Sequence, residues 1–281
     1  MISLSIAVPH CPWIPERVES MAKIRQALFV QDKYEWYAHV GQRIGFVAYK
    51  EFRDREPHYE WNVKLWRWSV EQRASHCLFL ADDTVLGPHA ISIVLAMLEA
   101  VPDQPIGLSS QHPSAPSVLR SGHHWYRCVS PWLVGWAYLL PKPLLAAFLR
   151  WHSQQSPALL RGNVSADDQL INMFLASIRC PTWHPLPTPF DHDLQIGSSL
   201  GHPIEAHGRR EASTKAPWTL LPWRPGPEPC PPNPLRYEEH WKHRTSSAPP
   251  ILECPPHEDS WRAWEEDQRH VGDFLEEERK T

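Results

Sequence analysis

Residues 77–86 read Cys-Leu-Phe-Leu-Ala-Asp-Asp-Thr-Val-Leu, and this stretch decides the predicted fold. Its apolar half, Cys77–Leu80, suits a short strand buried on both faces, as in a parallel sheet. Asp82 and Asp83 follow at the carboxyl end of this strand, where open α/β sheets bind their ligands. Two adjacent carboxylates there repel each other and lose hydration, so we expect a cation or a ligand's donor groups beside them. A helix N-cap or an ordinary loop position is the alternative for these acids.

Predicted strands and helices alternate around this stretch, which favours an α/β fold. Further strands are expected at residues 2–8, 44–49, 106–110 and 132–140. Helices are expected from residue 16, over 62–74, 88–101 and 141–151, and from 165. The first helix is predicted to turn one apolar face inward, made of Val18, Met21, Ile24 and Leu28.

Composition limits the classes of partner and the compartment. The chain has 281 residues and a formal net charge of −4, so no global basic field attracts nucleic acid or anionic membrane. No apolar run approaches the ~20 residues of a membrane helix, and the N-terminus lacks the charged region of a signal peptide. The 6 cysteines form no Cys-x-x-Cys pair, which favours reduced thiols over a cysteine-based zinc site. We therefore expect a cytoplasmic protein.

The character of the sequence changes after about residue 209. Residues 1–209 carry the alternating strands and helices and are predicted to form one α/β domain. Residues 210–281 are rich in proline and poor in periodic apolar positions, and they end in a charged stretch that suits a surface helix. They are predicted to form a C-terminal extension.

Two later polar clusters are candidates for chemistry. Asp167 and Asp168 begin a predicted helix, where one of them suits a general base for an acceptor hydroxyl; a capping-box role with Ser165 is the alternative. In Asp191-His192-Asp193, an extended backbone would turn both acids to one side and His192 to the other. A polar surface turn is the alternative there.

Three stretches, in this order and spacing, resemble the GT-A-type glycosyltransferases, a nucleotide-sugar transferase superfamily. Residues 62–83 resemble the metal-binding Asp-x-Asp region, with Ala81 where the first acid would stand. Residues 134–138 resemble the small-residue strand that lines the donor and acceptor site, and residues 165–169 the acidic helix start that supplies the base. The resemblance covers roughly residues 2–207. It implies a Rossmann-type mixed, mostly parallel sheet flanked by helices.

The resemblance also implies roles for particular residues. Asp83 would bind a divalent metal, Mn²⁺ or Mg²⁺, together with the donor's diphosphate, and His192 would complete the metal shell. Asp168 would act as the base, with Asp167 orienting the acceptor. The residues expected to bind the nucleotide-sugar donor are Pro9, His10, Asp54, Arg55, Asn62, Lys64, Asp82, Gly135, Trp136 and Ser198.

The resulting hypothesis is a metal-dependent glycosyltransferase. It would move a sugar from a nucleotide-diphosphate donor to a hydroxyl of a glycan, lipid-linked sugar, protein or modified nucleobase, with inversion at the anomeric carbon. A phage-type enzyme acting on modified DNA bases is one alternative. Others are a metal-dependent hydrolase using Asp83, His192 and Asp193, and a non-catalytic nucleotide- or glycan-binding protein, which the departure at Ala81 favours.

Overall fold

The structure of the chain is a computed structural model. It describes residues 2–31, 45–53, 58–87, 90–108, 125–128, 131, 133, 135, 137–155, 167–186, 188–193 and 196. The predicted C-terminal extension, residues 210–281, lies outside the described residues.

A seven-stranded sheet in the order β2-β1-β3-β7-β5-β8-β6 forms the centre of the molecule. Five strands run in one direction, and β7 and β6 run against them. The strands are β1 (Ser3–Pro9), β2 (Gly45–Phe52), β3 (His76–Leu80), β5 (Ile106–Gly107), β6 (Trp125–Cys128), β7 (Ala137–Pro141) and β8 (Thr182–Pro185). The predicted α/β class, with a mixed, mostly parallel sheet flanked by helices, is confirmed.

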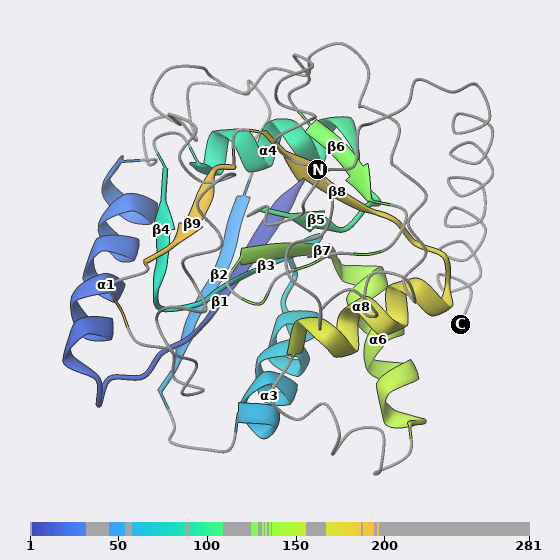
Figure 1. The fold of residues 1–281 in the computed structure, drawn as a ribbon, viewed down its shortest axis with the longest axis horizontal. Helices are drawn as coiled ribbons and strands as arrows, with labels where there is room; N and C mark the ends of the chain where they lie inside the picture. The colour runs from blue at the N-terminus through green and yellow to red at the C-terminus, as the bar shows by residue number, and fades with distance from the viewer. Residues whose placement is uncertain are drawn as a thin grey trace, which may run out of the picture.

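Helices cover both faces of this sheet (Figure 1). One face carries α3, α6 and α8, and α6 contacts both of its neighbours. The other face carries α4, while α1 lies beside β4. The helices are α1 (Pro15–Gln26), continued by the π-helical turn η1 (Ala27–Gln31), α3 (His58–Glu71), α4 (Ala90–Ala100), α6 (Lys142–Ser153) and α8 (Asp167–Ser177).

Both faces of strand β3 are buried, which explains why residues 77–80 are all apolar. Its side chains alternate between the two faces, so Leu78 and Leu80 join the core on the α4 side. Cys77 and Phe79 join the core under α3, α6 and α8. All four are at most 2% exposed. The strand therefore has no solvent face, as residues 77–80 predicted.

A second, two-stranded sheet begins directly after the acid pair. Its strands are β4 (Thr84–Leu86) and β9 (Phe190–His192), and they run antiparallel with Thr84 opposite His192. Figure 1 shows this small sheet between α1 and the main sheet. It brings the Asp-His-Asp segment back to the carboxyl end of β3.

Several predicted boundaries are wrong. β2 continues through Glu51 to Phe52, beyond the expected end at residue 49, and α3 begins at His58, before the expected start at residue 62. β7 begins only at Ala137, and Gly135 lies in a turn before it. β6 lies where no strand was predicted. The predicted boundaries differ from the observed ones because a charged or aromatic residue does not by itself show where a strand ends.

The buried face of α1 is also different from the prediction. Val18 is 43% exposed, whereas Arg17 is 4% exposed and shares the inner face with Met21 and Ile24. Positions 17, 21, 24 and 28 fit a helical stripe as well as positions 18, 21, 24 and 28 do. Apolarity favoured Val18 over Arg17 as the inner residue.

Within the part of the chain that the structure describes, no helix is both long enough and apolar enough to cross a bilayer.

Candidate functional site

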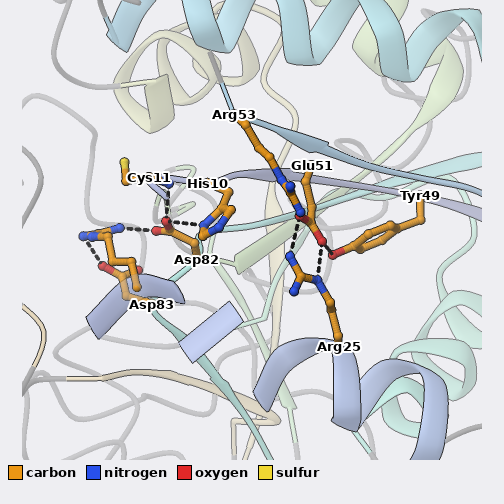
Figure 2. Close-up of polar contacts among 9 residues, drawn as sticks. His10, Cys11, Arg25, Tyr49, Glu51, Arg53, Asp82 and Asp83 are labelled. Atoms are coloured by element: carbon orange, nitrogen blue, oxygen red, sulfur yellow. Dashed lines mark hydrogen bonds and ion pairs between the residues drawn. The ribbon is translucent and has the colours of Figure 1, made fainter. Parts of the chain in front are cut away.

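The site is built where parallel strands β1 and β3 end side by side. Ala7 pairs with Phe79, so the residues after each strand leave the sheet at the same edge. There His10 Nδ1 lies 3.2 Å from Asp82 Oδ2, and the backbone N–H of Cys11 donates to the same oxygen at 2.6 Å. Figure 2 shows both groups converging on Asp82. The structure thus brings together two residues that were predicted separately.

Arg17 connects the two carboxylates. Its Nη1 pairs with Asp82 Oδ1, and its Nη2 lies 2.6 Å from Asp83 Oδ2. The three side chains are at most 5% exposed. The planar guanidinium fork suits such a pair, because two of its N–H groups can reach one oxygen on each acid.

The start of α1 explains how Arg17 reaches this position. Pro15 stands in the first helical turn, where its missing N–H costs nothing. Helical side chains lean toward the N-terminus, which directs Arg17 back toward the strand ends. A cation in the first turn opposes the helix dipole, so the two carboxylates must compensate that placement.

His192 completes the cluster from the second sheet. The pairing of β4 with β9 is extended by Asp193, whose N–H donates to the carbonyl of Asp83 at 2.8 Å. His192 Nε2 then lies 3.0 Å from Asp83 Oδ2. His192 is buried, while Asp191 and Asp193 are half-buried. The buried His192 between two half-buried acids fits an extended segment, and the predicted role of His192 as a metal ligand stays a prediction.

Burial and charge act against each other on the ionisable groups. Burial alone raises the pKa of Asp83, but the hydrogen bond and charge of His192 and the charge of Arg17 lower it below its ordinary value. Burial lowers the pKa of Arg17, and the two carboxylates raise it above the ordinary value. Burial, followed by the charge of Asp82, raises the pKa of the Cys11 thiol to about 12. Asp83 is thus held ionised, and Cys11 stays a neutral thiol.

The divalent metal implied by the resemblance does not fit between the acids in this arrangement. Both oxygens of Asp82 accept protein donors, and Asp83 Oδ2 accepts two. Of the four carboxylate oxygens of the pair, only Asp83 Oδ1 is buried without a hydrogen-bond partner among the described residues. Mn²⁺ and Mg²⁺ need several oxygen ligands. Among the described residues, no group of three or more His, Cys, Asp or Glu side chains is arranged to hold a metal ion.

A second ionic cluster surrounds Glu51, near the end of β2. Arg25 binds both of its oxygens, with Nε at 2.5 Å and Nη2 at 2.6 Å. Arg53 Nη2 lies 2.6 Å from Oε2, and the hydroxyl of Tyr49 donates to Oε1 at 2.7 Å. Figure 2 shows this cluster beside the acid pair. The register, with Val8 opposite Glu51, places it at the same edge of the sheet.

Its hydrogen-bonding partners hold Glu51 in the ionised form. Burial alone raises its pKa, but the hydrogen bonds from the two arginines and the tyrosine lower it to about 2. Burial and the hydrogen bond to Glu51 raise the pKa of Tyr49. The Glu51 side chain is 8% exposed, whereas Arg25 and Arg53 are 37% and 57% exposed. The positive charges of the cluster therefore face solvent.

The other predicted residues have varied outcomes. Pro9 ends β1 opposite Phe52, Asn62 is buried on α3 and Lys64 is exposed on the same helix. Asp168 is half-buried at the start of α8, which also contains Asp167, and the roles assigned to both remain predictions. Four predicted residues lie outside the described residues: Asp54, Arg55, Trp136 and Ser198.

Sequence reasoning missed the guanidinium and the backbone donor of the site. Arg17 had a signal, because it lies on the helical stripe of Met21 and Ile24. The Cys11 N–H had none, since a backbone donor carries no side-chain signature. The Glu51 cluster had a partial signal, because Tyr49 and Glu51 lie two apart and so share one face of a strand.

No protein-family model and no curated protein matches this sequence. Among solved structures, a similar chain is S. aureus TarS 1–349 in complex with UDP-GlcNAc. It is 11% identical, with a TM-score of 0.35 over 65% of this chain and 58% of that chain. The chain thus spans less than two thirds of that structure's length.

Proposed function

We propose that this protein is a glycosyltransferase that moves a sugar from a nucleotide-diphosphate donor to a hydroxyl acceptor. The observation that carries the proposal is the convergence on Asp82 and Asp83 of His10, from the end of β1, and His192, from β9. These groups meet at the carboxyl edge of a mixed α/β sheet, where folds of this class bind nucleotides.

The acid pair suits a ligand rich in hydroxyl groups. Asp83 Oδ1 is buried and has no hydrogen-bond partner among the described residues, so it offers an open acceptor. A lowered pKa keeps Asp83 ionised, and an ionised carboxylate accepts hydroxyl hydrogen bonds strongly. A ribose or a pyranose presents such donors, which supports a nucleotide sugar as the ligand.

In the proposed reaction Asp168 accepts the proton of the acceptor hydroxyl. The hydroxyl oxygen then forms a bond to the anomeric carbon from the face opposite the diphosphate. The bond between that carbon and the diphosphate breaks, and its electron pair leaves with the diphosphate. Inversion follows from attack on the opposite face.

The test is a panel of nucleotide sugars with glycan and nucleobase acceptors, each assayed with and without Mn²⁺. We expect one donor to raise the melting temperature and to release its nucleotide when an acceptor is present. Asp168→Asn should lower the turnover number by about 10²-fold or more and leave donor binding intact. Glu19→Gln, an exposed change on α1, is the matched control. If no donor binds and none is turned over, the proposal is wrong.

A non-catalytic nucleotide- or glycan-binding protein is the second candidate. It is favoured by Arg17, which already neutralises part of the charge of the acid pair. In that case a donor raises the melting temperature without any release of nucleotide. Release of sugar at equal rates with and without acceptor would instead indicate a hydrolase.

A further inference from the structure

We propose that Arg17 is the resident cation of the Asp82–Asp83 pair and holds the position that a bridging divalent metal would need. The site then takes its ligand without a metal between the two carboxylates. This inference concerns how the acids are neutralised, and its central test does not depend on which sugar or nucleotide binds.

The hydrogen bonds to the two acids leave too few oxygens for a bridging metal. Asp82 Oδ2 accepts from Cys11 N and faces His10 Nδ1, and Asp83 Oδ2 is shared by Arg17 and His192. The remaining oxygen of Asp82 is held by Arg17. A metal joining the acids needs an oxygen from each, whereas only Asp83 Oδ1 is open among the described residues.

Burial makes the exchange of Arg17 for a metal costly. Arg17 is 4% exposed, and its side chain begins in the first turn of α1. A metal that displaced the guanidinium would leave it without the two carboxylates in a buried place, which is strongly unfavourable. The helix cannot easily withdraw the side chain, because Met21 and Ile24 on the same face are fully packed in the core.

The same helix offers a matched control. Arg25 also binds a carboxylate with two of its nitrogens, but that acid is Glu51, and among the described residues no second acid shares Arg25. Arg25 is also 37% exposed. Removing the guanidinium from Arg25 therefore tests the loss of a charge from α1 without opening the Asp82–Asp83 pair.

The experiment measures Mn²⁺ binding to the full chain by the electron spin resonance of free Mn²⁺. Binding at the acid pair is defined as the part that Asp83→Asn removes. We expect the unaltered chain and Asp83→Asn to bind Mn²⁺ equally. Arg17→Gln should gain binding of about one equivalent of Mn²⁺, because the guanidinium that competes with the metal is gone. This Mn²⁺ should bind at least about tenfold more tightly than any Mn²⁺ at the acid pair of the unaltered chain. The double variant Arg17→Gln with Asp83→Asn should lose it, and Arg25→Gln should gain none.

Two results would overturn the inference. One is an equivalent of Mn²⁺ that the unaltered chain binds and Asp83→Asn loses. The other is a folded Arg17→Gln that gains no Mn²⁺. Should Arg17→Gln fail to fold, the comparison of the unaltered chain with Asp83→Asn still decides the question. Arg17→Lys, which keeps the charge, should behave as the unaltered chain.

A second arm rests on the proposed function. Donor binding and nucleotide release are measured in EDTA and in Mn²⁺, and we expect the two rates to agree within about twofold if Arg17 supplies the neutralising charge. Loss of turnover in EDTA that Mn²⁺ restores would contradict the inference. Absence of turnover under both conditions, with the Mn²⁺ binding pattern as expected, would reject the proposed function alone.

Discussion

Two carboxylate clusters, each held by an arginine of α1, lie at the same edge of the sheet and differ in their ratio of charges. At the ends of β1 and β3, Arg17 serves two acids, Asp82 and Asp83, and all three are buried. At the end of β2, Glu51 is served by two arginines that face solvent. The first cluster has one arginine for two acids, and the second has two arginines for one acid. The first should therefore depend strongly on its arginine, and the second should tolerate substitution.

The largest expected effect is that of Arg17→Ala on stability. It leaves two buried carboxylates without their shared cation, which should cost about 3–5 kcal/mol of the free energy of unfolding. Urea unfolding followed by tryptophan fluorescence measures this. Arg25→Ala, which opens only a partly exposed pair, should cost about 1 kcal/mol or less. Equal losses in the two variants would show that the clusters do not differ as described.

The next largest expected difference between the two clusters is in the rate of nucleotide release. Under the proposed function, Asp83→Asn should lower nucleotide release by about 10²-fold, as expected when a preorganised charge at a reacting centre is lost. Glu51→Gln should leave release within about threefold, because its carboxylate is already occupied by its own donors. Melting temperatures of both variants control for folding. A larger loss of nucleotide release in Glu51→Gln than in Asp83→Asn would indicate that the reacting centre lies at the second cluster.

Acid should weaken the second cluster in a defined window. The pKa of Glu51 is about 2 in the folded chain, below its ordinary value of 4.5. Its stabilising contribution is therefore complete above about pH 4.5 and is lost as the pH falls through about 2. We expect the difference in melting temperature between the unaltered chain and Glu51→Gln to shrink across this window. A difference that is constant with pH would contradict the assigned shift.

The smallest expected effect belongs to Arg53→Ala. Its guanidinium is 57% exposed, and Arg25 continues to bind Glu51 with two nitrogens. The free energy of unfolding should fall by less than about 1 kcal/mol, and by less still in 0.5 M salt, which screens exposed charges. Thermal unfolding at two salt concentrations measures this. A larger loss of the free energy of unfolding would mean that the ion pairs of Glu51 are as strong as buried ones.

The sequence was a good guide to the main sheet and a partial guide to the site. The run Cys77–Leu80 predicted its buried strand, because alternating faces that are both covered require apolar residues throughout. The acid pair and His192 were predicted, and the structure places them in contact. These are the features for which residue type alone carries the signal.

The cation of the site was missed for a physical reason. Hydrophobic periodicity assigns inner positions by apolarity, so Val18 was preferred to Arg17 on α1. An arginine can occupy an inner position only when acids elsewhere in the chain neutralise it. That pairing joins Arg17 to residues about 65 positions later, and no local pattern contains it. The end of β2 was misjudged similarly, since Glu51 lies within the strand and is paired with Arg25 and Arg53.

The pairing of β4 with β9 has a consequence for the order in which the site assembles during translation. Translation proceeds from the N-terminus, and N-terminal segments begin to fold first. Arg17 therefore precedes the acid pair out of the ribosome, whereas His192, which β9 brings to Asp83, emerges much later. A nascent chain that ends between β4 and β9 already holds the countercharge for its two acids. The β1–β3 half of the sheet can thus close before the last strand of the site has been synthesised.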